Sequence, residues 1–235
     1  MTIFVLGMHR SGTSVATKML ELMGVYVGEK DELLPATYDN PKGFFERKDA
    51  LAINQLIYKH HRANWFQVEY YDSPCPPLPV DINTRIAQLV EKLSARGVWA
   101  LKDPRLCFTL PEWKMAVQNP TIITVSRHPG EIAQSLALRN DIPFNDGLLL
   151  WQKYIEHALL HIEGLRVIKC DYADILENPL AVATKIYEQL LPIYPTLKQP
   201  AEDELKQFVD PAMKRALHKR EINTQQSALY ELWRQ

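Results

Sequence analysis

The chain has 235 residues, of which 46% are hydrophobic, and its 27 basic residues nearly balance its 28 acidic residues. This length and composition predict a single domain over residues 1–235, with a core at 3–190 and a helical C-terminal segment at 201–235. The net charge of −1 excludes a global field that would recruit nucleic acid or an anionic membrane, so any anion site must be local.

The sequence predicts a soluble cytoplasmic protein. The sequence starts with an apolar run that no basic region precedes. No run reaches the ~20 apolar residues of a membrane span. Its three cysteines, Cys75, Cys107 and Cys170, are odd in number and widely spaced, which favours reduced thiols over disulfides or a zinc site.

The first elements predicted are a strand, a glycine-punctuated loop and a helix. An apolar run at 3–6 precedes the loop, and apolar residues follow it at helical spacing as far as Met23. At such a junction the first N–H groups of the helix lack intrahelical partners and the positive dipole end faces the loop, so an anion can bind there. The residues expected to bind it are Arg10, Ser11, Gly12, Thr13 and Ser14.

The loop departs informatively from the Walker A phosphate-binding template. The spacing from Gly7 to Gly12 nearly fits that template, but Thr13 stands where it requires lysine, and the cation has moved to Arg10. This arrangement resembles the 5′-phosphosulfate-binding loop of sulfotransferases that use 3′-phosphoadenosine 5′-phosphosulfate (PAPS), in which Lys or Arg precedes Ser-Gly-Thr-Thr/Ser. A turn that binds no ligand is the structural alternative.

Residues 24–42 predict an irregular segment with turn signals, where an acceptor could be recognised. Glu46 follows this segment and an apolar Phe-Phe pair, and a helix is expected from Lys48 toward His60. Sulfuryl transfer to an alcohol needs a base, and desolvation would raise the pKa of a carboxyl at this position. Glu46 also resembles the catalytic glutamate of some carbohydrate and tyrosine sulfotransferases. His9 is a second candidate base, and a surface glutamate beside Arg47 is the alternative.

The rest of the chain alternates between predicted strands and helices. Prolines predict an extended connection at 73–80. Beyond it, helices are expected at 82–95, 111–117, 131–138, 146–162 and 179–191, and strands at 98–101, 121–125 and 165–169. This alternation predicts an α/β fold of three layers, a parallel central sheet with helices on both faces, similar to P-loop NTPases. Since ligands bind at the carboxyl ends of such strands, the residues that follow them should converge.

The second strand is followed by a dense set of charges, Lys102-Asp103-Pro104-Arg105. The segment resembles one that tyrosylprotein sulfotransferases carry near the sulfuryl group. By this resemblance Lys102 would hold the bridging oxygen between sulfate and phosphate, and Asp103 and Arg105 would be positioning residues. A solvated turn explains the same charges.

The third and fourth strands end in candidate nucleotide-binding residues. Arg127 follows the third strand, and Ser135 lies eight positions on, about two turns into a helix, so both can reach one phosphate. This spacing matches the 3′-phosphate-binding pattern of PAPS enzymes. Tyr172 lies in a segment similar to the Tyr-Glu-Asp-Leu…Pro segment of sulfotransferases, with Ala173 in place of the acidic residue. Contact with the nucleotide and a core position are both open for Tyr172.

The resemblance covers residues 3 to about 190 and implies a sulfotransferase. It would move a sulfuryl group from PAPS, its co-substrate, to a hydroxyl of a carbohydrate or other small-molecule acceptor, with Arg10, Lys102 and Glu46 as catalytic residues and no metal. One alternative is a P-loop small-molecule kinase using ATP and Mg²⁺, for which Asp103 would be a metal ligand. The other is a non-catalytic nucleotide-binding relative.

Overall fold

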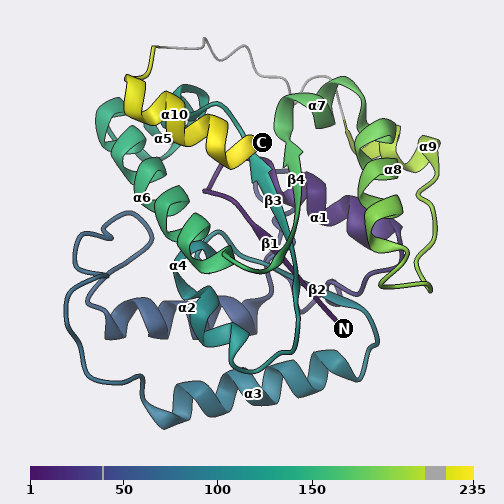
Figure 1. Cartoon of the computed structure of the whole chain (residues 1–235), viewed down its shortest axis with the longest axis horizontal. Coiled ribbons are helices and arrows are strands. Elements are labelled where there is room, and N and C mark those ends of the chain that lie inside the picture. Colours follow the sequence, from purple (N-terminus) through teal and green to yellow (C-terminus); the bar gives the residue numbers. More distant parts are fainter. Residues whose placement is uncertain (39, 210–220) are drawn as a thin grey trace.

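The computed structural model describes residues 1–38, 40–209 and 221–235 and contains a parallel four-stranded sheet (Figure 1). The strand order is β2-β1-β3-β4, with bounds β1 (Thr2–Leu6), β2 (Trp99–Lys102), β3 (Thr121–Ser126) and β4 (Arg166–Asp171). All neighbouring pairs are parallel, which confirms the predicted α/β fold.

The three strands β1, β2 and β3 are buried along their whole length. Continuous apolar runs are typical of parallel strands that are covered on both faces. In register, Val5 of β1 lies opposite Lys102 of β2 and Ile123 of β3. The carboxyl ends of the strands therefore meet at one edge of the sheet, and Lys102, the last residue of β2, lies at that edge.

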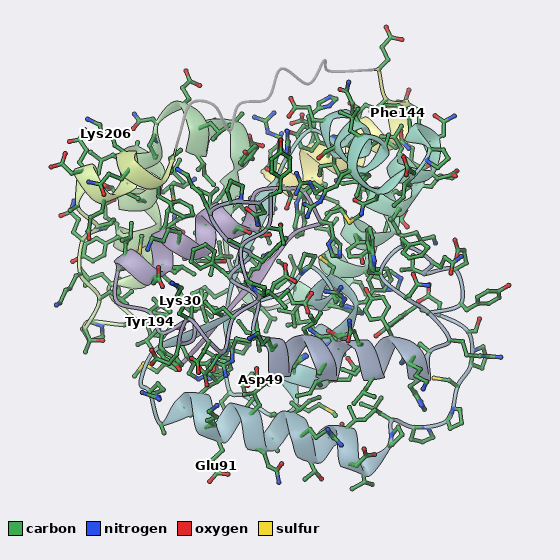
Figure 2. The ribbon with its side chains drawn as sticks, turned by 180° about the vertical axis from the view of Figure 1, so that it is seen from behind. Lys30, Asp49, Glu91, Phe144, Tyr194 and Lys206 are labelled. Atoms are coloured by element: carbon green, nitrogen blue, oxygen red, sulfur yellow. The ribbon has the colours of Figure 1, made fainter. Side chains whose placement is uncertain are left out.

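Helices cover both faces of the sheet (Figure 1). One layer contains α2 (Lys48–His60), α3 (Val80–Ser94), α4 (Leu106–Lys114), α5 (Pro129–Asn140), α6 (Phe144–Ile162) and α10 (Thr224–Arg234). The other contains α1 (Thr13–Leu22), α7 (Tyr172–Glu177), α8 (Pro179–Leu190) and α9 (Glu202–Phe208). In Figure 2, Phe144 at the start of α6 and Lys206 of α9 lie at opposite sides of the molecule.

Successive side chains of β1 contribute alternately to the two hydrophobic cores, one on each face of the sheet. Phe4 and Leu6 pack into the core beneath α2, α4 and α6, whereas Ile3 and Val5 pack against α1 and α8. Successive side chains of a strand point to opposite faces, so one short apolar segment anchors three layers.

Two of the predicted elements were wrong in detail. The helix predicted to begin at Pro111 begins at Leu106 and contains Pro111. A proline cannot bond the carbonyl four residues before it, and here the ring Nδ1 of His161 donates to that carbonyl, of Cys107, at 3.0 Å. Cys107 therefore keeps a hydrogen-bond partner, which allows the proline inside the helix.

The segment after the predicted fourth strand is also more regular than expected. The strand continues through Asp171, and Tyr172 begins the separate helix α7. Asp171 caps this helix, because its carboxylate accepts the N–H of Ala173 at 2.8 Å.

The C-terminal segment forms α9 and α10, and the helix start predicted at Pro211 lies outside the described residues. Across the described part of the chain, no helix is both long and apolar enough to cross a bilayer.

Candidate functional site

The loop between β1 and α1 is a tight turn with two residues in the left-handed region. Arg10 has φ 72° and Gly12 has φ 94°, and the N–H of Ser11 donates to the carbonyl of Met8 at 3.1 Å. Among the described residues, no side chain caps the N-terminus of α1, and the buried hydroxyl of Ser11 has no hydrogen-bond partner. Polar groups left in this way at a helix N-terminus suit an anionic ligand.

Gly12 is required by the packing of Tyr172 against the loop. A Cβ on Gly12 would lie 2.1 Å from Cδ2 of the Tyr172 ring, so no side chain fits there. The guanidinium carbon of Arg127 lies 4.7 Å from the centroid of the same ring, at cation–π distance. Tyr172 is buried, and it is both a core residue and a direct neighbour of the loop.

Arg10 connects the two residues expected to bind the second phosphate. Its Nε donates to the hydroxyl of Ser135 at 2.9 Å, and its carbonyl accepts from Nη1 of Arg127 at 2.9 Å. The Nε of Arg127 donates to the carboxylate of Glu131 at 3.0 Å, so two different nitrogens of the guanidinium are held by protein acceptors. The ends of β1 and β3 therefore meet at a single group of side chains that contains Arg10, Arg127 and Ser135.

Lys102 and Glu46 form a buried ion pair beside the start of α1. The Nζ of Lys102 lies 2.6 Å from Oε1 of Glu46, and it also donates to the carbonyl of Phe44 at 3.0 Å and to the hydroxyl of Ser14 at 3.4 Å. Ser14 donates to the same carbonyl at 3.1 Å. Glu46 is 6% exposed, which excludes the alternative of a surface glutamate. Three distant segments therefore place one cation and one carboxylate at the edge of the loop.

The pKa of Glu46 is raised by burial. The nearby charge of Asp103 adds to the rise in this pKa, while Lys102 and Arg105 oppose it. The carboxylate therefore lies in an environment that favours proton uptake, as a general base requires.

Asp103 is a buried anchor of the turn after β2. Oδ1 accepts the N–H and the guanidinium of Arg105, both at 2.9 Å, and Oδ2 accepts the amide of Asn54 at 2.9 Å. Both carboxylate oxygens are thus occupied by protein donors, and Asp103 is 1% exposed. This geometry positions Lys102 and Arg105 and disfavours Asp103 as a magnesium ligand.

Asn54 is a site residue that the sequence analysis missed. It is fully buried on α2, and its carbonyl accepts from Thr109 and from the indole of Trp113, both at 2.8 Å. One feature of the sequence could have indicated it: Asn54 is a polar residue next to Ile53, on the apolar face of the helix predicted there.

His9, the second candidate base, packs against aromatic rings. Its ring lies 4.7 Å from that of Trp65 and 5.7 Å from that of Tyr154, and its buried Nε2 has no hydrogen-bond partner among the described residues. Burial lowers the pKa of His9 well below its ordinary value, and Arg105, Lys102 and Arg10 lower it further. Burial and these cations therefore weaken His9 as a proton acceptor.

The cysteines and acidic residues suggest no further chemistry at this site. The described residues contain no group of three or more His, Cys, Asp or Glu side chains that could hold a metal ion. Cys75, Cys107 and Cys170 are free, and burial raises the thiol pKa of both Cys107 and Cys170 to about 12, which makes these two thiols poor nucleophiles.

Comparison with known proteins shows the fold and the family of the chain. The structure is similar to the sulfotransferase domain from the curacin biosynthetic pathway, with a TM-score of 0.58 and 15% identity over 98% of this chain and 96% of that one. It is also similar to the sulfotransferase domain from the Synechococcus PCC 7002 olefin synthase, with a TM-score of 0.57 and 16% identity over 98% and 93% of the two chains. At these identities the likeness establishes the fold. A search of curated proteins finds no match. The model of the sulfotransferase family, however, matches residues 2–191, and the chain therefore belongs to the sulfotransferase family.

Proposed function

We propose that the chain transfers a sulfuryl group from PAPS to the hydroxyl of a small-molecule acceptor. The observation that carries the proposal is the connection of Arg127 to Arg10 and of Arg10 to Ser135. It brings the predicted 3′-phosphate residues to the loop predicted to bind the 5′-phosphosulfate. Family membership supports the transfer of sulfate.

The residues of the loop fit an anionic donor. The unpartnered Ser11 hydroxyl, the absence of a side chain at Gly12 and the N-terminus of α1 suit the 5′-phosphosulfate. Arg127 and Ser135 would hold the 3′-phosphate, and the ring of Tyr172 would support the loop beneath it. Arg10 and Lys102 would stabilise negative charge on the transferring group.

In the proposed reaction the acceptor oxygen forms a bond to sulfur while the bond between sulfur and the bridging oxygen breaks. The electron pair of that bond stays on the phosphate oxygen, where Lys102 would stabilise it, and adenosine 3′,5′-bisphosphate leaves. The acceptor proton passes to Glu46, whose pKa is raised by burial. The 2.6 Å contact between Lys102 and Glu46 keeps the two groups side by side for these steps.

A cytoplasmic location and a single domain are also parts of the proposal. The free cysteines are consistent with a reducing compartment. The two hydrophobic cores share the strands of one sheet, which supports folding as one unit.

Calorimetric titration with adenosine 3′,5′-bisphosphate and with ATP·Mg tests the donor. We expect the bisphosphate to bind at least about tenfold more tightly, because Arg127 and Ser135 suit a 3′-phosphate. Arg127→Met should weaken bisphosphate binding about tenfold or more, whereas Arg166→Met, at an exposed position, should not. Tighter binding of ATP·Mg would overturn the proposal in favour of a kinase.

A further inference from the structure

A cavity of about 790 Å³ lies between residues 65–69 and the start of α6. Its walls come from residues 65–69, from the α5–α6 connection at 140–143, and from Asp146, Leu149 and Lys153 on α6. This volume is within the range of about 300–1,000 Å³ that is common for small-molecule sites. None of the residues assigned to donor binding lines the cavity.

Trp65 joins the cavity to the loop between β1 and α1. Its ring lines the cavity and lies 4.7 Å from the ring of His9 in the loop. The hydroxyl of Tyr154 donates to the backbone carbonyl of Trp65 at 2.7 Å and fixes this wall to α6. The wall of the cavity at Trp65 is therefore in contact with the loop.

The end of α5 gives a second connection. Asn140 lines the cavity, and the guanidinium of the preceding Arg139 lies 5.7 Å from the ring of Phe44. The carbonyl of Phe44 accepts from Lys102. Arg139, next to the cavity wall in the sequence, therefore contacts the residue whose carbonyl also accepts from Lys102.

The lining combines apolar surface with an excess of acidic groups. Phe66 and Leu149 line the cavity and are 45% and 59% exposed, so apolar surface faces this space. Glu69, Asp141 and Asp146 outnumber the single basic residue, Lys153. The lining would therefore repel an anionic ligand.

We infer that this cavity binds the sulfuryl acceptor, and that the acceptor is an alcohol or phenol with an apolar body and no negative charge. The inference rests on the proposed function. Apolar surface stabilises an apolar body by about 25 cal/mol per Å² removed from water. A carbohydrate presents hydroxyls along its whole length, whereas half of the fourteen lining residues are apolar. The cavity therefore favours an acceptor with an apolar body over the carbohydrate that the family resemblance suggested.

Calorimetry on the full chain saturated with adenosine 3′,5′-bisphosphate tests the inference without requiring turnover. The probes are 2-naphthol, its carboxylate analogue 6-hydroxy-2-naphthoate, and N-acetylglucosamine. We expect 2-naphthol to bind at least about tenfold more tightly than either of the other two. Glu69→Gln combined with Asp146→Asn should reduce the discrimination against the naphthoate and leave 2-naphthol binding unchanged.

Two substitutions on α6 form a matched pair. Leu149→Gln should weaken 2-naphthol binding about tenfold, whereas Leu160→Gln, at a position 65% exposed and outside the cavity, should leave it unchanged. Bisphosphate affinity should stay the same in both variants. Equal 2-naphthol affinities in the two variants, or tighter binding of the sugar, would overturn the inference. A chain that fails to bind the bisphosphate at all would instead contradict the proposed function.

Discussion

At the scale of residues, the buried ion pair of Lys102 and Glu46 is central to the proposed chemistry. A carboxylate that is 6% exposed and 2.6 Å from an ammonium group is costly to bury, because both ions lose their hydration. A structural role alone would be served equally well by two apolar residues. A buried ion pair at the edge of a predicted anion site is therefore a reason to assign it a catalytic function.

Glu46→Gln should lower the rate of sulfuryl transfer by about 10²–10⁴-fold, the usual contribution of a general base. The substitution keeps the size of the side chain and removes the proton acceptor, so adenosine 3′,5′-bisphosphate should bind as in the unmodified chain. Turnover with radiolabelled donor and calorimetry of the product measure the two effects separately.

The control for this variant is Glu163→Gln, an exposed glutamate after α6, which should not change the rate. The rate of the unmodified chain should rise with pH through the pKa of Glu46, because the base acts when deprotonated and burial places this pKa above the ordinary value. A Glu46→Gln chain with full activity would exclude Glu46 as the base. A chain that binds the bisphosphate but never transfers sulfate would be a non-catalytic relative.

At the scale of elements, the junction between β1 and α1 depends on Gly12, which packs against Tyr172 at the start of α7. Gly12→Ala combines a left-handed backbone with a contact of 2.1 Å to Tyr172, so we expect lower thermal stability and weaker bisphosphate binding. The backbone alone costs about 1–2 kcal/mol. Differential scanning calorimetry and product titration measure the two losses.

Gly24 provides the matched comparison for this variant. It has φ 91°, and a Cβ there would meet nothing within 4 Å. Gly24→Ala should therefore show the backbone cost alone and keep the bisphosphate affinity. If both variants bind the bisphosphate equally well, the contact between Gly12 and Tyr172 is irrelevant to the site.

Helix α4 carries a buried carboxyl whose protonation should affect stability. Burial raises the pKa of Glu112 to about 7 from 4.5, and its buried Oε2 has no hydrogen-bond partner among the described residues. Since the folded chain binds this proton more tightly than the unfolded chain, the stabilisation is complete below pH 4.5 and is lost as pH rises through 7. A shift of this size corresponds to about 3 kcal/mol.

Glu112→Gln should therefore remove this pH dependence. Relative to the unmodified chain, the variant should gain up to about 3 kcal/mol of unfolding free energy between pH 4.5 and pH 8. Urea denaturation at both pH values provides the measurement. Glu91→Gln, at an exposed position on α3, is the control (Figure 2). Identical pH profiles for Glu112→Gln and the unmodified chain would contradict the raised pKa.

Across the whole molecule, the last helix connects the sheet to the donor site. The indole of Trp233 on α10 donates to the carbonyl of Val125 in β3 at 3.3 Å. The hydroxyl of Tyr230 donates to Asp171 at 3.1 Å, and Asp171 is the residue that caps α7 before Tyr172. The far C-terminal end of the chain thus lies against the strands that carry the predicted nucleotide-binding residues (Figure 1).

Trp233→Ala should destabilise the fold by about 3–5 kcal/mol, the usual cost of deleting a buried tryptophan side chain. The neighbouring Leu232 is 60% exposed, whereas Trp233 is 1% exposed, so Leu232→Ala should have little effect. Urea denaturation of both variants measures the difference. Equal stabilities would show that α10 does not contribute to the folded core.

The sequence by itself determined the order and type of most elements, because apolar runs and helical spacing are local signals. The limits of α2 were predicted without error. The residues that follow the strand ends were named as site candidates from parallel-sheet geometry together with the resemblance to sulfotransferases. Helix α4 was mispredicted, because the hydrogen bond from His161 that allows Pro111 inside it comes from a residue 50 positions later in the chain.

The tertiary structure decided which of these candidates touch. Strand register and layer packing decide that Arg10 bonds Ser135, that Lys102 pairs with Glu46 and that His9 packs against Trp65. No local pattern contains this information, because each contact joins segments at least 56 residues apart. The cavity proposed for the acceptor has the same origin: its walls come from two segments about 75 residues apart, and folding brings them together.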